Sequence, residues 1–181
     1  MPSHRKSQTV MVIDTRALRR SGISALLAPW AERHELEINA LSPEQALELF
    51  EADNGCQMIV LNVGGQSITE REIQQRLKVI RALSPNAPIV AMSDREDSAE
   101  VMAALSAGLQ GFLPTSIAQE LALEAFSFIL KGGSFFPPSA IRNASPAPPQ
   151  EPEPSPTGRG GNGERCRSGG GHRAATDDID D

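Results

Sequence analysis

The sequence predicts an α/β domain built on a doubly wound parallel sheet, and three observations lead to this prediction. Short apolar runs at Val10–Ile13, Met58–Asn62 and Ile89–Met92 are each closed by a polar residue, which is typical of strands buried on both faces. Segments with apolar residues at helical spacing separate the runs. The connections contain only a few residues, so strand and helix alternate five times along the chain.

The first half of the domain holds two predicted strands and two predicted helices. Val10–Ile13 is the first strand, and a helix follows it. The apolar residues of this helix are Leu18, Ile23, Leu26, Leu27 and Trp30. Alternating charged and apolar residues predict a short edge strand at Glu37–Leu41. Ser42–Gln45 combines an N-cap serine, a first-turn proline and a capping-box glutamine, so a helix is expected through about Ala52.

The second half begins with the central strand, Met58–Asn62. Capping boxes are predicted at Thr69–Glu72 and at Ser116–Gln119, and Asp97 is expected to cap the helix that lies between them. The three predicted helices end near Leu83, Gly108 and Lys131. The remaining strands are predicted at Ile89–Met92, which is closed by Ser93, and at Gln110–Pro114.

Composition and charge exclude several classes of protein. The chain has 181 residues and a net charge of -6, with no basic block to attract nucleic acid. No segment is apolar and long enough to cross a membrane, and the polar N-terminus does not resemble a secretory signal. Cys56 and Cys166 lack the spacing of metal ligands. We therefore expect a cytoplasmic protein with free thiols, no membrane contact and no direct binding of nucleic acid.

The composition changes after Ile141. Residues 142–181 contain 7 Gly and 6 Pro and no aromatic residue, so they cannot bury enough surface to offset the entropy lost on ordering. The predicted organisation is a flexible N-terminus at 1–9, a folded domain at 10–141 and a disordered tail at 142–181. Pro156–Arg159 allows a second interpretation, in which the tail derives from a truncated or frame-shifted longer regulator.

Three stretches resemble the receiver domain of response regulators, in the LuxR/NarL-type branch. They are Val10–Asp14 with Ser21–Ile23 and Leu26–Leu27, then Ala107–Leu113, and finally Ile129–Pro138. The resemblance extends over roughly residues 9–141. It implies a flavodoxin-like (βα)5 fold with strand order 2-1-3-4-5.

The resemblance also implies five functional positions. Receivers use two acidic residues and an aspartate to hold Mg²⁺, and that aspartate accepts a phosphoryl group from a histidine kinase, while a hydroxyl residue and a lysine contact the phosphoryl oxygens. In this sequence Asp14 stands at the position of the first acidic residue, and Ser93 stands at the position of the hydroxyl residue. Thr15 replaces the second acid, Asn62 replaces the phospho-acceptor, and Thr115 replaces the lysine.

The three replacements remove the same chemistry. An amide oxygen is neutral and forms no stable phosphoryl link, so Asn62 should not be phosphorylated. Asp14 alone should hold Mg²⁺ weakly, and Thr115 cannot balance a phosphoryl charge. We therefore predict a degenerate pseudo-receiver with no catalytic residue, no cofactor, no metal site and no phosphotransfer from a kinase.

Simpler structural roles remain open for the same positions. Asn62 could cap its own turn, Asp14 could be a helix N-cap and Ser93 a turn residue. Thr115, with Ser116, is interpreted as a helix cap. Phe112 matches the switch aromatic of the family, but a half-buried core ring is the favoured interpretation.

The last predicted helix has more apolar residues than one core-facing stripe requires. A homodimer is expected, with Leu123, Phe126 and Leu130 on its surface. The alternative is that Phe135–Pro138 covers this surface.

The leading functional hypothesis is a non-enzymatic signalling module that acts through phosphorylation-independent contacts with proteins, in two-component signal transduction or in the regulation of transcription. The alternative is a truncated or frame-shifted LuxR-type DNA-binding transcriptional regulator, although no helix-turn-helix pattern is present. A nucleotide- or flavin-binding enzyme is disfavoured, because Asp14–Arg16 stands where a glycine-rich phosphate loop would be needed.

Overall fold

A computed structural model describes residues 8–50 and 56–138 of the chain. The predicted tail at 142–181 and most of the predicted N-terminal segment lie outside these residues. Thr9 is an exception, because it begins the first strand and is buried.

The sheet has five parallel strands in the order β2-β1-β3-β4-β5. This confirms the predicted doubly wound, flavodoxin-like topology with strand order 2-1-3-4-5, and it confirms Glu37–Leu41 as an edge strand. The strands are β1 (Thr9–Ile13), β2 (Glu37–Leu41), β3 (Cys56–Gly64), β4 (Ile89–Ser93) and β5 (Gly111–Pro114). The strand order reverses between β1 and β3, where folds of this type place their functional sites.

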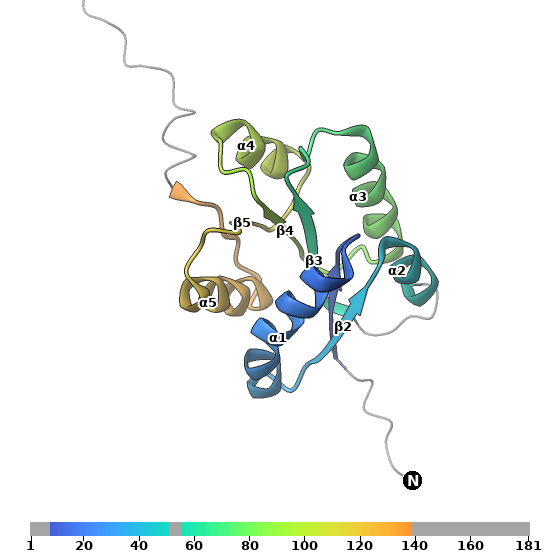
Figure 1. Ribbon diagram of the computed structural model, residues 1–181, viewed down its shortest axis with the longest axis vertical. Helices are drawn as coiled ribbons and strands as arrows, with labels where there is room; N and C mark the ends of the chain where they lie inside the picture. Colours follow the sequence, from blue (N-terminus) through green and yellow to red (C-terminus); the bar gives the residue numbers. More distant parts are fainter. Residues whose placement is uncertain (1–7, 51–55, 139–181) are drawn as a thin grey trace, which may run out of the picture. The chain divides into compact units, whose positions relative to one another are not determined.

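Helices cover both faces of the sheet (Figure 1). They are α1 (Ala17–Arg33), α2 (Pro43–Phe50), α3 (Arg71–Leu83), α4 (Ser98–Ser106) and α5 (Gln119–Leu130). One apolar cluster joins the sheet to α2, α3 and α4, and a second joins it to α1 and α5. Right-handed crossovers between parallel strands produce this division.

The central strand β3 is apolar at successive positions because both of its faces are covered by helices. In β3, Ile59 and Leu61 belong to the cluster under α3 and α4, while Met58 and Val60 belong to the cluster under α1 and α5. Because successive side chains point to opposite faces, a strand covered on both faces must be apolar at every position. Leu18 departs from the prediction, since it is 87% exposed and takes no part in the core face of α1.

Two of the four predicted helix caps are confirmed. Ser42 and Gln45 exchange reciprocal side-chain bonds, with Ser42 N–H donating to Gln45 Oε1 at 2.9 Å and Gln45 N–H to Ser42 Oγ at 3.3 Å. Asp97 accepts from the N–H of Glu100 at 3.1 Å.

The two other predicted boxes are wrong. The predicted box at Thr69–Glu72 is replaced by a turn that begins two residues earlier, in which Ser67 N–H donates to Glu70 Oε1 at 2.8 Å. Before α5 the N-cap is Ala118, without a side-chain bond. Ser116 lies two residues before this N-cap, and its hydroxyl donates to Glu96 instead of accepting from the first N–H groups of α5.

The segment that follows α5 lies along the edge of β5. Phe112 N–H donates to the carbonyl of Phe135 at 2.9 Å, and Phe135 N–H donates to the carbonyl of Gln110 at 3.0 Å. Phe135 therefore covers part of a strand edge that would otherwise expose unpaired backbone groups. Within the described residues, no helix is long and apolar enough to cross a membrane.

Candidate functional site

The carboxyl edge of the sheet brings the predicted site residues together. Asp14 follows β1, Asn62 lies near the end of β3, Ser93 ends β4 and Thr115 follows β5. The strand pairing shifts between Asn62 and Gly64, so that Gly64 is paired with Ser93. This irregularity extends β3 two residues beyond its predicted end.

Asp14 is the centre of the site and is only 1% exposed. Its Oδ1 accepts from the N–H of Arg16 at 2.7 Å and from Nη2 of Arg19 at 2.9 Å, and its Oδ2 accepts from Nδ2 of Asn62 at 2.6 Å. The helix N-cap interpretation is wrong, because Arg16 is the N-cap of α1 and makes no side-chain cap bond. The carboxylate instead holds the turn before the helix and joins β1 to β3.

Arg19 is a site residue that sequence reasoning missed. Its Nε lies 2.8 Å from Asp14 Oδ2, without the alignment of a hydrogen bond, so the guanidinium faces both carboxylate oxygens. Arg20 adds a bond from Nη1 to the backbone carbonyl of Asp14 at 2.7 Å. The available signal was a cluster of arginines directly after a strand-ending aspartate in an acidic chain.

Gly64 makes room for Arg19. Its φ of +58° suits glycine, and a Cβ built there would lie 2.3 Å from Arg19 Nη1. The guanidinium therefore spans the space between the aspartate after β1 and the backbone that ends β3.

Asn62 makes two side-chain hydrogen bonds. Its Oδ1 accepts from the N–H of Gly64 at 3.1 Å, as expected for an asparagine that caps its own turn. Its Nδ2 donates to Asp14, so the residue predicted at the acceptor position lies in contact with the residue predicted as the first acid. An aspartate at this position could accept from Gly64 but could not donate to Asp14.

Ser93 has the predicted role of a turn residue. Its buried hydroxyl accepts from the N–H of Arg95 at 3.1 Å and donates to the carbonyl of Gly64 at 3.3 Å.

An acidic pocket was predicted at Asp14 and Thr15, but Thr15 is exposed and has no hydrogen bond to the Asp14 carboxylate. The name pocket is kept for Asp14 together with Arg19 and Asn62, which contact its carboxylate.

Thr115 and Ser116 do not cap α5, which corrects the prediction. Thr115 Oγ1 donates to Asp94 Oδ1 at 2.8 Å, and Ser116 Oγ donates to Glu96. Both hydroxyls tie the loop after β5 to the loop after β4. Of these two residues, Thr115 is the one predicted at the position of the receiver lysine, and here its side chain joins two loops of the chain.

Glu100, in α4, holds the loop that follows β3. It is a second residue that sequence reasoning missed. It is 3% exposed and accepts from the N–H of Ile68 at 2.8 Å and from the hydroxyl of Ser67. Arg95 Nε lies 3.5 Å from Glu100 Oε1. The signal in the sequence was a charged residue on the core face of α4, at the spacing of Val101 and Ala104.

The residues present do not fit a divalent metal ion. Among the described residues no group of three or more His, Cys, Asp or Glu side chains could hold one. Mg²⁺ is usually bound by one or two carboxylates at close range, and here the carboxylate of Asp14 is already surrounded by donors. We therefore derive no step that involves such an ion.

Phe112 and α5 give two further corrections. Phe112 is fully buried under α3 and α4 rather than half-buried. Phe126 is only 1% exposed and belongs to the core, so it must be removed from the predicted dimer surface. Leu123 and Leu130 are partly buried, whereas Leu121 and Phe128 are the exposed large apolar residues of α5.

No protein-family model and no curated protein matches the chain. Solved structures do match. A LuxR family DNA-binding response regulator from Silicibacter pomeroyi is 28% identical, with a TM-score of 0.61 over 73% of this chain and 98% of that chain. A LuxR family two-component response regulator from Aurantimonas sp. SI85-9A1 is 20% identical, with a TM-score of 0.59 over 74% and 92%.

The isolated REC domain of RcsB from Salmonella enterica serovar Typhimurium has a TM-score of 0.58 at 17% identity, over 75% of this chain and 97% of that chain. The regulator from Aurantimonas and the RcsB domain are only 20% and 17% identical to this chain, so they are evidence for the fold alone. The topology, the position of the site and these structures agree with the resemblance predicted from the sequence: the described residues have the fold of a response-regulator receiver domain and are similar in structure to LuxR-family regulators.

Proposed function

We propose that this chain is a phosphorylation-independent receiver: a non-enzymatic module of a two-component-type signalling or transcription-regulating system that acts through contacts with proteins. The observation that carries the proposal is the bonding of Asp14. In a working receiver this carboxylate helps to hold a metal ion beside an aspartate nucleophile. Here it accepts from Asn62 and Arg19 instead.

The loops around the pocket support the same conclusion. A phospho-switch needs a hydroxyl and a lysine that are free to contact the phosphoryl oxygens. Ser93 and Thr115 bond to Gly64 and Asp94, and Glu100 holds the loop that follows β3. The loop between β4 and α4 is thus hydrogen-bonded both to the end of β3 and to the loop after β5, without a phosphoryl group.

The test is to incubate the protein with Mg²⁺ and a small phosphodonor such as acetyl phosphate, and to measure its intact mass at neutral pH. We expect no added phosphoryl group. A receiver domain that retains its acceptor aspartate serves as the positive control in the same buffer. A stable gain of one phosphoryl group by the wild-type chain would contradict the proposal.

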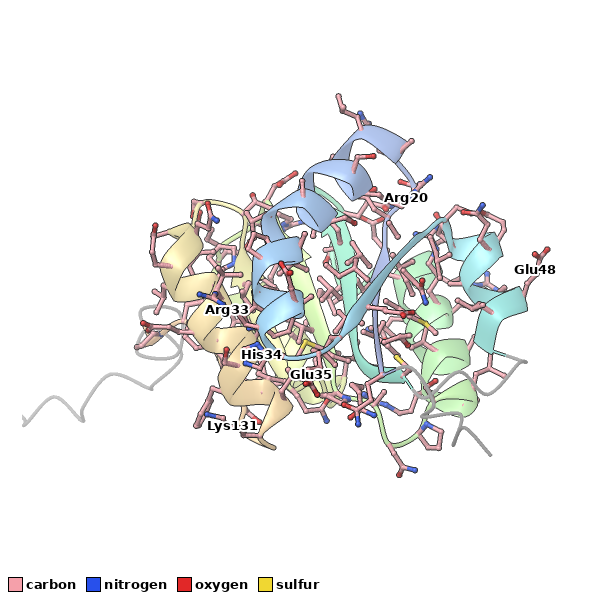
Figure 2. The ribbon with its side chains drawn as sticks, turned by 90° about the horizontal axis from the view of Figure 1, so that it is seen from below. Arg20, Arg33, His34, Glu35, Glu48 and Lys131 are labelled. Carbon is pink, nitrogen blue, oxygen red and sulfur yellow. The ribbon has the colours of Figure 1, made fainter. Side chains whose placement is uncertain are left out.

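The proposed protein contact lies on α1 and α5. The two helices are joined by Trp30, whose Nε1 donates to Ser127 Oγ at 2.8 Å. Between them runs a groove of about 590 Å³, and Figure 2 shows Arg33, His34 and Lys131, three of its lining residues, toward the same end of the domain. Phe128, also on this groove, is 56% exposed.

Charge favours a second copy of the chain as the occupant of this surface. Glu120 and Glu124 lie in the first half of α5, and Lys131 follows its last turn. If α5 packs against its own copy about a two-fold axis in antiparallel orientation, the acidic end of each helix meets the basic end of the other. Exposed Leu121 and Phe128 would then be covered.

Sedimentation velocity tests the dimer. We expect a dimer for the wild type and a monomer for Phe128→Glu, because a charge at that position would be buried without a partner. Leu47→Glu is the matched control, since Leu47 is 43% exposed on α2, which covers the other face of the sheet. A wild type that remains monomeric at high concentration would exclude the homodimer.

A further inference from the structure

Two features of Arg19 set it apart from an ordinary surface ion pair. Its partner Asp14 has a side-chain exposure of 0%, while the side chain of Arg19 is 35% exposed. The guanidinium also lies against Gly64, where any side chain would collide with it. A cation is therefore built into the place where the negative charge of the pocket is buried.

We propose that Arg19 is the fixed cation of this pocket, and that it excludes a divalent metal ion independently of the loss of the acceptor aspartate at position 62. The inference rests on the proposed function, because it explains how a receiver keeps its buried acid stable without metal. It also makes a separate claim: restoring an aspartate at position 62 alone does not restore metal binding.

The first argument is geometric. A divalent ion such as Mg²⁺ needs direct contact with carboxylate oxygens at about 2.0–2.1 Å. Nη2 of Arg19 is 2.9 Å from Asp14 Oδ1, and Nε is 2.8 Å from Oδ2. The guanidinium and a metal ion cannot both approach the same two oxygens, so one cation must leave before the other binds.

The second argument is the charge balance. Asp14 and Arg19 together carry no net charge, and Asn62 adds none. Asn62→Asp introduces one further negative charge beside a guanidinium that is already in place. Since arginine stays protonated at all ordinary pH values, it remains available as the counter-ion of the new carboxylate. Only removal of Arg19 leaves two carboxylates without a protein cation against the carboxylate of Asp14, because Arg20 bonds to the backbone carbonyl of that residue.

The experiment measures binding of Mn²⁺, which prefers the same oxygen ligands as Mg²⁺, from the loss of the electron paramagnetic resonance signal of the free ion. Wild type, Asn62→Asp and the double variant Arg19→Gln/Asn62→Asp are compared. We expect Mn²⁺ to bind the double variant at least tenfold more tightly than it binds Asn62→Asp. Equal affinity for these two variants would overturn the proposal.

Arg16 provides the matched control. Its side chain is exposed at the same end of α1, and its contact with Asp14 is made by the backbone N–H, which a substitution keeps. Arg16→Gln/Asn62→Asp removes one positive charge near the pocket without removing the guanidinium that touches the carboxylate. We expect Mn²⁺ to bind it no more tightly than Asn62→Asp. Binding as tight as that of Arg19→Gln/Asn62→Asp would show a general field effect and would overturn the assignment to Arg19.

If Arg19→Gln/Asn62→Asp does not fold, variants that keep Asn62 decide the question. Arg19→Gln should lower the midpoint of urea unfolding in the wild-type background, and lower it much less when Asp14→Asn is also present, because the charge that Arg19 balances is then absent. Equal shifts in both backgrounds would overturn the proposal. Phosphorylation of the wild type would refute the proposed function, whereas tight Mn²⁺ binding by Asn62→Asp alone would refute only the role of Arg19.

Discussion

The side-chain amide of Asn62 donates to the carboxylate of Asp14 over 2.6 Å, between two residues that are both buried. Because the amide oxygen of Asn62 accepts from Gly64, the orientation of the amide group is determined by its two partners. A neutral donor next to a buried anion stabilises that anion, which a second carboxylate could not do. Asn62 is therefore a structural partner of Asp14.

Asn62→Asp should destabilise the domain by about 2–4 kcal/mol, because a donor is lost and two carboxylates then face each other. The exchanged pair Asp14→Asn/Asn62→Asp restores one acid and one amide, and we expect it to recover more than half of the loss. Urea unfolding followed by circular dichroism measures both effects. If Asn62→Asp were as stable as the wild type, the hydrogen bond would not have the importance assigned to it.

Gly64→Ala should cost at least about 1–2 kcal/mol, because its φ of +58° is unfavourable for alanine and the new Cβ would meet Arg19. Arg19→Gln should relieve the steric part of this cost, so the two substitutions should not be additive.

Gly22→Ala is the control, and we expect its effect on stability to have the opposite sign to that of Gly64→Ala. That glycine lies within α1 with no atom near its Cβ position, so alanine should stabilise the domain by about 0.5–1 kcal/mol. Thermal or urea unfolding of the four variants checks this prediction.

Glu100→Ala should destabilise the domain by about 2–3 kcal/mol, because it leaves the N–H of Ile68 without its charged acceptor. Hydrogen exchange at the Ile68 amide provides a local measurement, and we expect it to become faster in the variant. Glu48→Ala is the matched control, since Glu48 is exposed on α2 and its loss should change stability by less than about 0.5 kcal/mol. Unchanged protection of Ile68 would contradict the role of Glu100.

Cys56 should react slowly with alkylating reagents in the folded protein. Burial raises the pKa of its thiol to about 11, against an ordinary value of 9.0. Because only the thiolate reacts, alkylation at pH 8 should be at least about tenfold slower than in the urea-unfolded chain. Peptide mapping after timed treatment with iodoacetamide measures the rate. Equal rates in the folded and unfolded chains would mean that the thiol is not shielded.

The same pKa difference predicts how stability changes with pH. The folded state binds the thiol proton more tightly than the unfolded state, so this stabilisation is fully present below about pH 9 and is lost as the pH rises toward 11. The loss is at most about 3 kcal/mol. Cys56→Ala removes the group, so its free energy of unfolding should fall less than that of the wild type over this range.

Local patterns in the sequence were sufficient to predict the fold. Apolar runs closed by polar residues located the strands, and the Ser42–Gln45 and Asp97 caps located two helix starts, because each feature depends on residues that are close together in the chain. The resemblance to receivers placed Asp14 and Asn62 correctly at the carboxyl edge of the sheet. It also predicted that receiver chemistry is lost at three positions, Thr15, Asn62 and Thr115.

Only the tertiary structure decided what those positions contact. Arg19 was not among the predicted site residues, and Thr115 was expected to be a helix cap. Instead they contact Asp14 and Asp94, because the ends of neighbouring parallel strands bring loops that are distant in sequence to one edge of the sheet. The removal of Phe126 from the predicted surface has the same kind of cause. Apolar spacing shows that a residue can be buried, but the neighbouring helix α1, through Trp30, determines which residues of α5 are covered.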